Sequence, residues 1–178
     1  METYPAYDII IIGTGSIGSA CCYYAAKSGY QVLGLDQYQV PHIYGSHSGQ
    51  SRIYRTAYFE HSNYVPLLEQ SYANWKQLER ITNRQFLHQS GLVYFGEQND
   101  ILLRGVRYAS EKYSIPIREL DAFQIKSEFP QFNLKENIQG LLEEEAGFII
   151  ADQTIASFRK LAIEAGAEIR GQNPVENF

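Results

Sequence analysis

The sequence has only two cysteines, Cys21 and Cys22, and they are adjacent. Adjacent residues on a helix point to different faces, so these thiols form neither a C-x-x-C pair nor a metal site. We therefore predict buried, unreactive thiols and no bound metal.

Long apolar runs are also missing. No run approaches the roughly 20 residues needed to span a bilayer, and the first residues, METYPAYD, lack the basic segment of a signal peptide. Basic residues are outnumbered, with 15 Lys and Arg against 20 Asp and Glu, so no basic stripe is available to neutralise phosphates. These absences predict a cytoplasmic protein that binds neither membranes nor nucleic acid. The remaining composition, 44% hydrophobic and 20% charged over 178 residues, is that of a globular protein.

Residues 8–36 have the pattern of a nucleotide-binding unit. A β-branched run over 9–12 predicts a buried parallel strand, residues 16–28 predict a helix, and residues 32–35 predict a second strand. Gly13, Gly15 and Gly18 follow the first strand at G-x-G-x-x-G spacing, which permits a tight turn and brings a pyrophosphate to the helix N-terminus.

Asp36 ends the second strand about 20 residues after the glycines, where a carboxylate accepts hydrogen bonds from ribose hydroxyls and disfavours a 2′-phosphate. The expected ligand is the ADP moiety of FAD or NAD, and these residues leave the choice open. A purely structural glycine turn is the alternative, although the strand, helix and acid all agree with dinucleotide binding.

Residues 37–60 carry no helical period and are rich in Gly, Ser and His. A long loop inside a compact domain is usually functional, and we expect an ordered, functional loop here. Its segment GSHSGQSRIYRTAY, with the glycine motif, resembles the G-S-x-x-G-x-[ST]-R-x-x-R-x-A-Y signature of monomeric sarcosine oxidase, N-methyltryptophan oxidase and pipecolate oxidase. The resemblance to these FAD-dependent amine oxidases favours FAD over NAD, and it continues through residues 64–67, 91–93, 147–148 and 175–178.

The resemblance implies that the catalytic residues include Arg52, Arg55 and Tyr58. It places Arg52 against the flavin and makes Arg55 the anchor of the substrate carboxylate, with Tyr58 in the same pocket. The residue types fit, because an arginine supports negative charge on a reduced flavin and binds a carboxylate bidentately. Solvated arginines or structural ion pairs are the alternative.

Within the cofactor site, His47 matches a flavin-contacting histidine of the family. Ser48 departs from the second histidine that the bacterial enzymes usually carry, so the resemblance assigns no role to this position. His42 and His61 are interpreted as surface or capping groups. The predicted cofactor-binding residues are Gly13, Gly15, Ser16, Ile17, Gly18, Asp36, Gln37, Ser46, His47, Ser51, Arg52, Ile53 and Val175.

The later chain predicts a helix over about 64–82, a strand, turn and strand over 86–95 and a helix over 99–113. Residues 114–117 are expected to lead into another short strand, and Asp121 is expected to cap a short helix. Glu143, Glu144 and Glu145 are interpreted as solvated acidic surface. From residue 152 a helix that stops at Gly166 and a strand over 167–170 return the chain to an α/β pattern.

We therefore predict an α/β fold in which a Rossmann-like FAD-binding domain, with a parallel sheet and flanking helices, occupies residues 1–85 and 148–178. Residues 86–147 are predicted to form part of a second, α+β substrate domain. The nucleotide sheet is unfinished and family members are longer, so we interpret the chain as the N-terminal half of a longer protein that lacks its C-terminal half here.

The function that the resemblance implies is an FAD-dependent oxidase of a secondary amino acid, such as sarcosine, another N-methyl amino acid or pipecolate. It yields an imine and hydrogen peroxide with oxygen as the second substrate, and the full-length protein is expected to be a monomer. Two alternatives stay open: a flavin dehydrogenase that hands electrons to a carrier, and a non-catalytic dinucleotide-binding module. Covalent attachment of FAD is not predictable here, because neither Cys21 nor Cys22 matches the family's linking cysteine.

Overall fold

The computed structural model describes residues 6–177 and confirms the predicted α/β class. The chain divides into two compact units: one contains the described residues up to Arg52 and those from Ile150 onward, and the other contains Ile53–Ile149. The first division falls at residues 52 and 53, whereas the sequence interpretation put a domain boundary after residue 85. The domain organisation of the whole protein stays a prediction.

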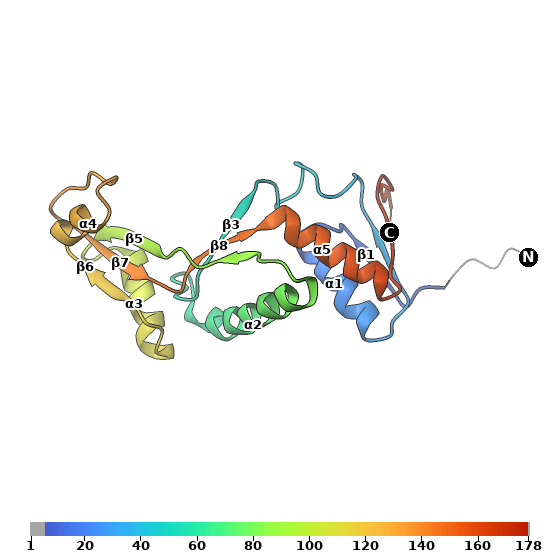
Figure 1. Cartoon of the computed structure of the whole chain (residues 1–178), viewed down its shortest axis with the longest axis horizontal. Coiled ribbons are helices and arrows are strands. Elements are labelled where there is room, and N and C mark those ends of the chain that lie inside the picture. Colours follow the sequence, from blue (N-terminus) through green and yellow to red (C-terminus); the bar gives the residue numbers. More distant parts are fainter. Residues whose placement is uncertain (1–5, 178) are drawn as a thin grey trace, which may run out of the picture. The chain divides into compact units, whose positions relative to one another are not determined.

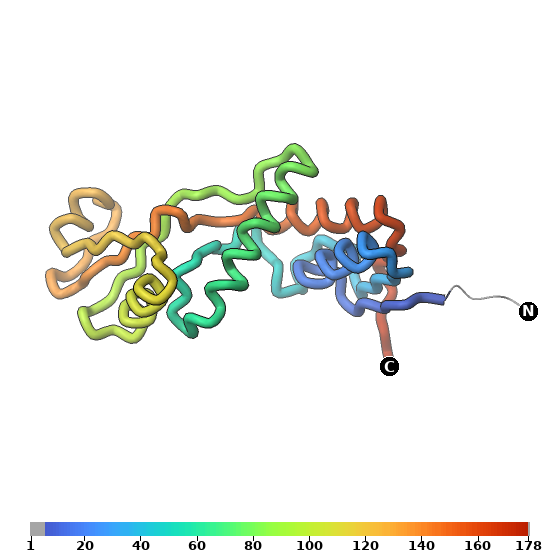
Figure 2. The backbone as a smooth tube through the Cα atoms, turned by 90° about the horizontal axis from the view of Figure 1, so that it is seen from below, coloured from blue at the N-terminus to red at the C-terminus, as the bar shows by residue number. Residues whose placement is uncertain are grey.

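The first unit contains the predicted parallel sheet. Strands β1 (Ile9–Ile12), β2 (Val32–Leu35) and β9 (Glu168–Arg170) lie in the order β1-β2-β9. Helices α1 (Ser16–Lys27) and α5 (Ala151–Glu164) lie side by side although they are far apart in sequence (Figure 1 and Figure 2). The Tyr23 and Phe158 rings meet between them with centroids 5.9 Å apart. These elements match the predicted bounds closely, because the apolar strands and the glycines after each helix are local signals.

The prediction that both cysteines of α1 are buried is correct for Cys22 and wrong for Cys21. Cys22 is fully buried, and burial raises the pKa of its thiol to about 11, with a further contribution from the neighbouring Cys21. Cys21 is exposed, so the prediction of a buried thiol is wrong there. Adjacent helical positions point to different faces, and only the face of Cys22 is covered.

The second unit is built on an antiparallel sheet in the order β5-β7-β6, from β5 (Leu92–Glu97), β7 (Ile138–Glu143) and β6 (Arg118–Leu120). Helix α3 (Ile101–Tyr113) packs on this sheet through Leu103 and Val106, which share a core with Ala57, Tyr94 and Leu141. The predicted short helix is α4 (Ala122–Glu128), and Asp121 begins it with a capping box.

The remaining elements are η1 (Ser62–Tyr64), α2 (Val65–Thr82) and a short sheet in the order β3-β8-β4, from β3 (Ser51–Tyr54), β8 (Gly147–Ile150) and β4 (Leu87–His88). His61 caps η1, since its Nδ1 accepts a hydrogen bond from the Asn63 N–H at 3.3 Å, which confirms its capping role. Along the described part of the chain, no helix has the length and apolarity that crossing a bilayer requires.

Two expectations about local structure were wrong, and a third, the short strand before Asp121, is confirmed. The region 37–60 is not loop throughout, because β3 occupies residues 51–54. The short strand expected to follow residues 114–117 is confirmed and begins at Arg118, since Ser114 ends α3 in the left-handed conformation and Pro116 has no N–H to donate to a ladder. Glu143 is not solvated, because β7 carries it into the interior with 1% of its surface exposed.

Candidate functional site

The turn between β1 and α1 is shaped by its glycines. Gly13 has a φ of 88°, which residues with a Cβ rarely adopt, and its N–H donates to the Leu35 carbonyl at 2.8 Å. A Cβ at Gly18 would lie 1.8 Å from the Gly13 carbonyl oxygen, so only glycine lets α1 approach the turn this closely. Helix α1 begins at Ser16 without a capping side chain, which leaves the N–H groups of its first turn and its positive end open to an anion.

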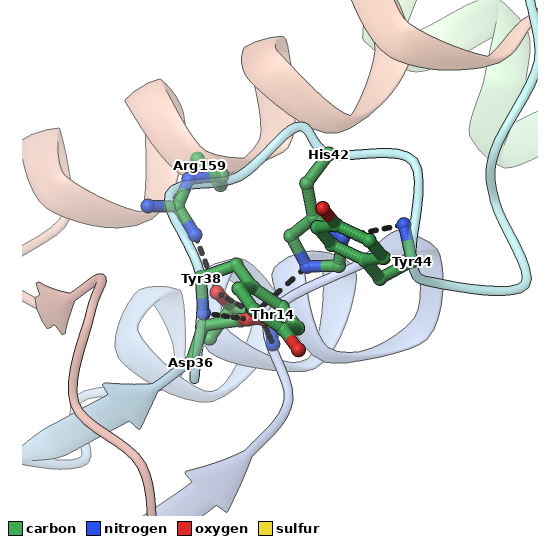
Figure 3. A network of polar contacts seen from close by, with 6 residues as sticks. All are labelled: Thr14, Asp36, Tyr38, His42, Tyr44 and Arg159. Carbon is green, nitrogen blue, oxygen red and sulfur yellow. Dashed lines mark hydrogen bonds and ion pairs between the residues drawn. The ribbon is translucent and has the colours of Figure 1, made fainter.

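Asp36 stands at the carboxyl end of β2 and is 7% exposed. Its Oδ2 accepts hydrogen bonds from the Thr14 N–H at 2.7 Å and the Thr14 hydroxyl at 3.3 Å. Its Oδ1 accepts from the Tyr38 N–H at 3.1 Å and lies 3.2 Å from His42 Nε2 (Figure 3). Burial raises the pKa of Asp36, but the N–H groups of Thr14 and Tyr38 together with His42 outweigh it, so the net pKa is below its ordinary value. The carboxylate is therefore charged at neutral pH and tied to the glycine turn.

Aromatic rings from the following loop cover this carboxylate. The Tyr38 ring lies 5.0 Å from the His42 ring and 4.5 Å from the Tyr44 ring, measured between centroids. The Tyr44 N–H also donates to His42 Nδ1 at 3.2 Å, so the His42 ring is held on both sides (Figure 3). His42 is thus part of the site, contrary to its interpretation as a surface or capping group.

Helix α5 adds a cation behind the turn. Arg159 donates from Nη1 to the Thr14 hydroxyl (Figure 3). Burial lowers the pKa of Arg159, and the charge of Asp36 opposes that lowering. Sequence reasoning missed Arg159, because nothing in its spacing links a residue of α5 to a turn so far away along the chain.

A pocket of about 410 Å³ lies over the turn and the end of β2. Most of the predicted cofactor residues line it: Gly13, Gly15, Ser16, Ile17, Gly18, Asp36, Gln37, Ser46, His47 and Val175. Ser51, Arg52 and Ile53 do not line it. Residues that sequence reasoning missed complete the wall: Ile12, Leu35, Tyr38, His42, Gly45 and Asn173. The pocket gathers the predicted residues, and their cofactor contacts stay a prediction.

The pocket wall contains a polar atom that lacks a partner. His47 is 4% exposed, and within the described residues its buried Nε2 makes no hydrogen bond. An unsatisfied buried polar group costs about 1–3 kcal/mol, so a polar ligand atom in the pocket would stabilise this arrangement. With the open N-terminus of α1 and the fixed charge of Asp36, the residues fit a dinucleotide that brings a diphosphate and a ribose.

Arg52 closes the loop that leads to β3. Its guanidinium donates to the Ser46 carbonyl at 2.8 Å, to the Ser51 carbonyl at 2.8 Å and to the Ser48 carbonyl. These contacts hold the backbone of Ser46, which lines the pocket. Arg52 therefore shapes the loop through its donors, and its predicted place against a flavin stays a prediction.

Arg55, in the second unit, is 21% exposed and already binds a carboxylate. Its Nη2 donates to Glu60 Oε1 at 2.7 Å and Oε2 at 2.9 Å. Its guanidinium carbon also lies 4.7 Å from the Tyr58 ring centroid and 4.8 Å from that of Phe59. Among residues 6–177, Nε and Nη1 of Arg55 have no hydrogen-bond partner. The ion pair agrees with the alternative of a structural role, while the remaining donors leave room for a second carboxylate.

Glu143 lies behind the same segment. Its Oε1 accepts a hydrogen bond from the Thr56 N–H at 2.6 Å, and its Oε2 accepts from the Ala57 N–H at 3.2 Å and from the Tyr94 hydroxyl at 2.7 Å. Burial raises the pKa of Tyr94, and the neighbouring Glu143 carboxylate raises it further. The carboxylate thus joins β5, β7 and the backbone between Arg55 and Tyr58. Sequence reasoning missed this role, because Glu143 opens a run of three glutamates that looks solvated.

The chain matches one protein-family model, that of the FAD dependent oxidoreductases (DAO), over residues 8–178. Among curated proteins it is similar to N-methyl-L-tryptophan oxidases from Yersinia pestis (strain Pestoides F) and Yersinia pseudotuberculosis serotype O:1b (strain IP 31758). Each is 36% identical over 169 residues, which cover 95% of this chain and 46% of the relative. The chain therefore spans about half the length of the curated relatives it matches.

Among solved structures, the open form of NikD, an unusual amino acid oxidase essential for nikkomycin biosynthesis, matches with a TM-score of 0.85 and 26% identity over 95% of this chain and 44% of NikD. The L-proline dehydrogenase from P. horikoshii matches with a TM-score of 0.81 at 19% identity, over 99% of this chain and 46% of that one. The latter likeness concerns the fold alone. Together these findings confirm the predicted fold class and the resemblance to flavin amine oxidases.

Proposed function

The chain belongs to the family of FAD-dependent oxidoreductases, and from this premise we propose that it is the cofactor-binding portion and part of the substrate site of an oxidase. The proposed substrate is an N-methyl amino acid or another secondary amino acid, and the products are an imine and hydrogen peroxide. FAD is the family's cofactor, which confirms the prediction of FAD over NAD. The similarity to N-methyl-L-tryptophan oxidases supports the substrate class.

The observation that carries the proposal is the environment of Arg55. A guanidinium packed against Tyr58 and Phe59 presents one nitrogen to the carboxylate of Glu60 and keeps further donors open. An amino-acid substrate brings a carboxylate that matches these donors. Either it joins Glu60 on the guanidinium or it displaces Glu60, and the two rings keep the cation in place in both cases.

When bound, FAD supplies the redox chemistry by accepting a hydride equivalent from the carbon next to the amine nitrogen. The chain's own residues bind and orient. We propose that the open first turn of α1 holds the diphosphate, that Asp36 meets the adenosine ribose, and that His47 Nε2 bonds to the cofactor. Arg52 keeps the loop over the pocket in shape, and its charge is proposed to stabilise negative charge on the reduced flavin.

The first experiment is an anaerobic visible spectrum of the full-length protein before and after addition of N-methyl-L-tryptophan, sarcosine or pipecolate. Flavin bands that bleach with one of these compounds support the proposal, and comparison among the three defines the substrate. Air is then admitted and hydrogen peroxide is assayed. Bleaching without peroxide indicates the dehydrogenase alternative, whereas a colourless protein that still binds ADP indicates the non-catalytic module.

The role of Arg55 is tested separately with Arg55→Ala. We expect the KM for the amino acid to rise about tenfold or more, because a charge-assisted contact is lost, while the flavin content stays unchanged. Arg104→Ala is the matched control, since Arg104 is an exposed arginine of the same unit. Wild-type kinetics in Arg55→Ala would remove Arg55 from the substrate site.

A further inference from the structure

A buried carboxylate supports the backbone that presents Arg55 and Tyr58. Glu143 is 1% exposed, and its oxygens accept from the N–H groups of Thr56 and Ala57, the two residues between Arg55 and Tyr58. The contact with Thr56 bridges 87 positions of sequence. A single side chain therefore fixes the middle of the segment that carries both predicted catalytic side chains of the second unit.

The chemistry of this contact goes beyond packing. Among the described residues Glu143 forms no ion pair with a basic group, so its buried charge is stabilised by the two N–H groups and by the Tyr94 hydroxyl. Burying a charge in this way is costly unless its hydrogen bonds are well made, which sets the position of their donors narrowly. The charge of Arg55 also reaches the same cluster, since it opposes the raised pKa of Tyr94.

Glu144 and Glu145, which follow in the sequence, show that a carboxylate in this run of three glutamates does not by itself bind the Thr56-Ala57 backbone. Glu144 is 72% exposed, and its Oε1 lies 3.5 Å from Arg118 Nε. Glu145 is also exposed. Only Glu143 is turned into the interior by β7. The run therefore contains one buried carboxylate and a neighbour of the same type that serves as an internal control.

We propose that Glu143 is a positioning residue for the substrate site, because its carboxylate holds the Thr56-Ala57 backbone so that Arg55 and Tyr58 meet the substrate carboxylate. This inference rests on the proposed function. It predicts that loss of the Glu143 carboxylate weakens binding of a substrate through its carboxylate and leaves its amine end recognised as before.

The test compares Glu143→Gln with Glu144→Gln in the full-length, flavin-loaded protein. Glutamine keeps the size of the side chain and the Oε1 acceptor, which lies 2.6 Å from the Thr56 nitrogen and 3.3 Å from the Ala57 nitrogen. Its amide nitrogen replaces Oε2 and cannot accept from the Tyr94 hydroxyl or from the Ala57 N–H. Anaerobic flavin bleaching is followed against the concentration of N-methyl-L-tryptophan and of N-methyltryptamine, which is the same amine without the carboxylate. Hydrogen exchange of the peptide over residues 55–60 is measured on the same proteins.

In Glu143→Gln we expect the half-saturating concentration of N-methyl-L-tryptophan to rise about tenfold, while that of N-methyltryptamine and the limiting bleaching rates stay within about twofold. Exchange over 55–60 becomes faster. Glu144→Gln behaves as wild type in both measurements. An unchanged half-saturating concentration in Glu143→Gln, or an equal loss for both amines, overturns the proposal.

Two further outcomes are separated by design. If N-methyl-L-tryptophan, sarcosine and pipecolate all leave the wild-type flavin unbleached, the proposed function fails, and unchanged exchange in Glu143→Gln then also overturns the anchoring of the segment. If Glu143→Gln does not fold, Tyr94→Phe removes one of the three donors. It is expected to raise the half-saturating concentration about threefold for the amino acid alone, and no change there overturns the proposal.

Discussion

Asp36 and Glu143 are two buried carboxylates that do the same kind of work in different units. Each is less than a tenth exposed, and each accepts backbone N–H groups from a segment with a proposed ligand contact. Asp36 binds Thr14, 22 positions away within one strand, helix and strand unit, whereas Glu143 binds Thr56, 87 positions away. His42 and Arg159 provide polar partners around the Asp36 cluster, while the donors to Glu143 within residues 6–177 are all neutral.

The difference teaches that a buried carboxylate can hold a backbone segment at both sites, while the stability of the two units depends to different degrees on its hydrogen bonds. Asp36 has four hydrogen-bonding contacts around it, including a histidine, so the loss of one leaves others. Glu143 is the common acceptor for three donors from two separate parts of the chain, the adjacent N–H groups of Thr56 and Ala57 and the hydroxyl of Tyr94. Its removal leaves the Thr56 and Ala57 N–H groups without this acceptor and leaves the Tyr94 hydroxyl only the Ala57 carbonyl at 3.5 Å among the described residues, and we expect the second unit to be the more fragile of the two.

The largest effect is therefore expected for Glu143→Ala. Three donors lose a charged acceptor inside the protein, and unfolding should become easier by about 3 kcal/mol or more. The urea-unfolding midpoint of the full-length protein, followed by circular dichroism, measures this change. Glu144→Ala should shift the free energy of unfolding by less than about 0.5 kcal/mol, because Glu144 is mostly exposed. Equal midpoints for the two variants would break the comparison.

The role of Asp36 was predictable from the sequence and that of Glu143 was not, because their hydrogen-bond partners lie at different separations along the chain, 22 positions for Asp36 and 87 for Glu143. The apolar run, the glycine spacing and Asp36 lie within one continuous stretch, and local geometry there decides both the fold and the site. Glu143 belongs to β7, which sequence reasoning did not predict, and its neighbours Glu144 and Glu145 are chemically the same. Only the pairing of β7 with β5 and β6 decides which glutamate faces inward.

His42 and Arg159 lie between these extremes. Both approach Asp36 or Thr14 from elements that a spacing motif does not describe, a loop and the helix α5 (Figure 3). Sequence reasoning predicted α5 correctly as a helix, yet the side of α5 that meets the glycine turn depends on its packing against α1. The elements were thus predictable and the contacts between distant elements were not.

A middle-sized effect is expected for Arg159→Met, which keeps an apolar stem but removes the donor to Thr14 and a cation near Asp36. Loss of this partly buried contact should destabilise the protein by about 1–2 kcal/mol. It should also weaken ADP binding to the apoprotein, because the glycine turn loses a support. Lys160→Met is the control, since Lys160 is 77% exposed and its Nζ makes a surface ion pair, 3.7 Å from Glu164 Oε1 on the same helix, which contributes little to stability. Calorimetric titration with ADP and urea unfolding measure both effects, and similar values for the two variants would exclude Arg159 from the site.

The smallest effect is expected from the titration of Asp36, because burial opposes the hydrogen bonds that lower its pKa. A carboxyl group with a lowered folded-state pKa stabilises the protein above its unfolded-state pKa of about 3.9, and this stabilisation is lost as the pH falls through the folded-state pKa. In Asp36→Asn the group no longer titrates, so the free energy of unfolding should fall less steeply below about pH 4 than in the wild-type protein. Other carboxylates with lowered pKa values, such as Glu79, titrate in both proteins and cancel in the difference. Urea unfolding of the two apoproteins between pH 6 and pH 3 gives that difference. Parallel curves throughout would mean that the bonds from Thr14 and Tyr38 stabilise the charged carboxylate no better than water does, and the resemblance between Asp36 and Glu143 would then be one of geometry alone.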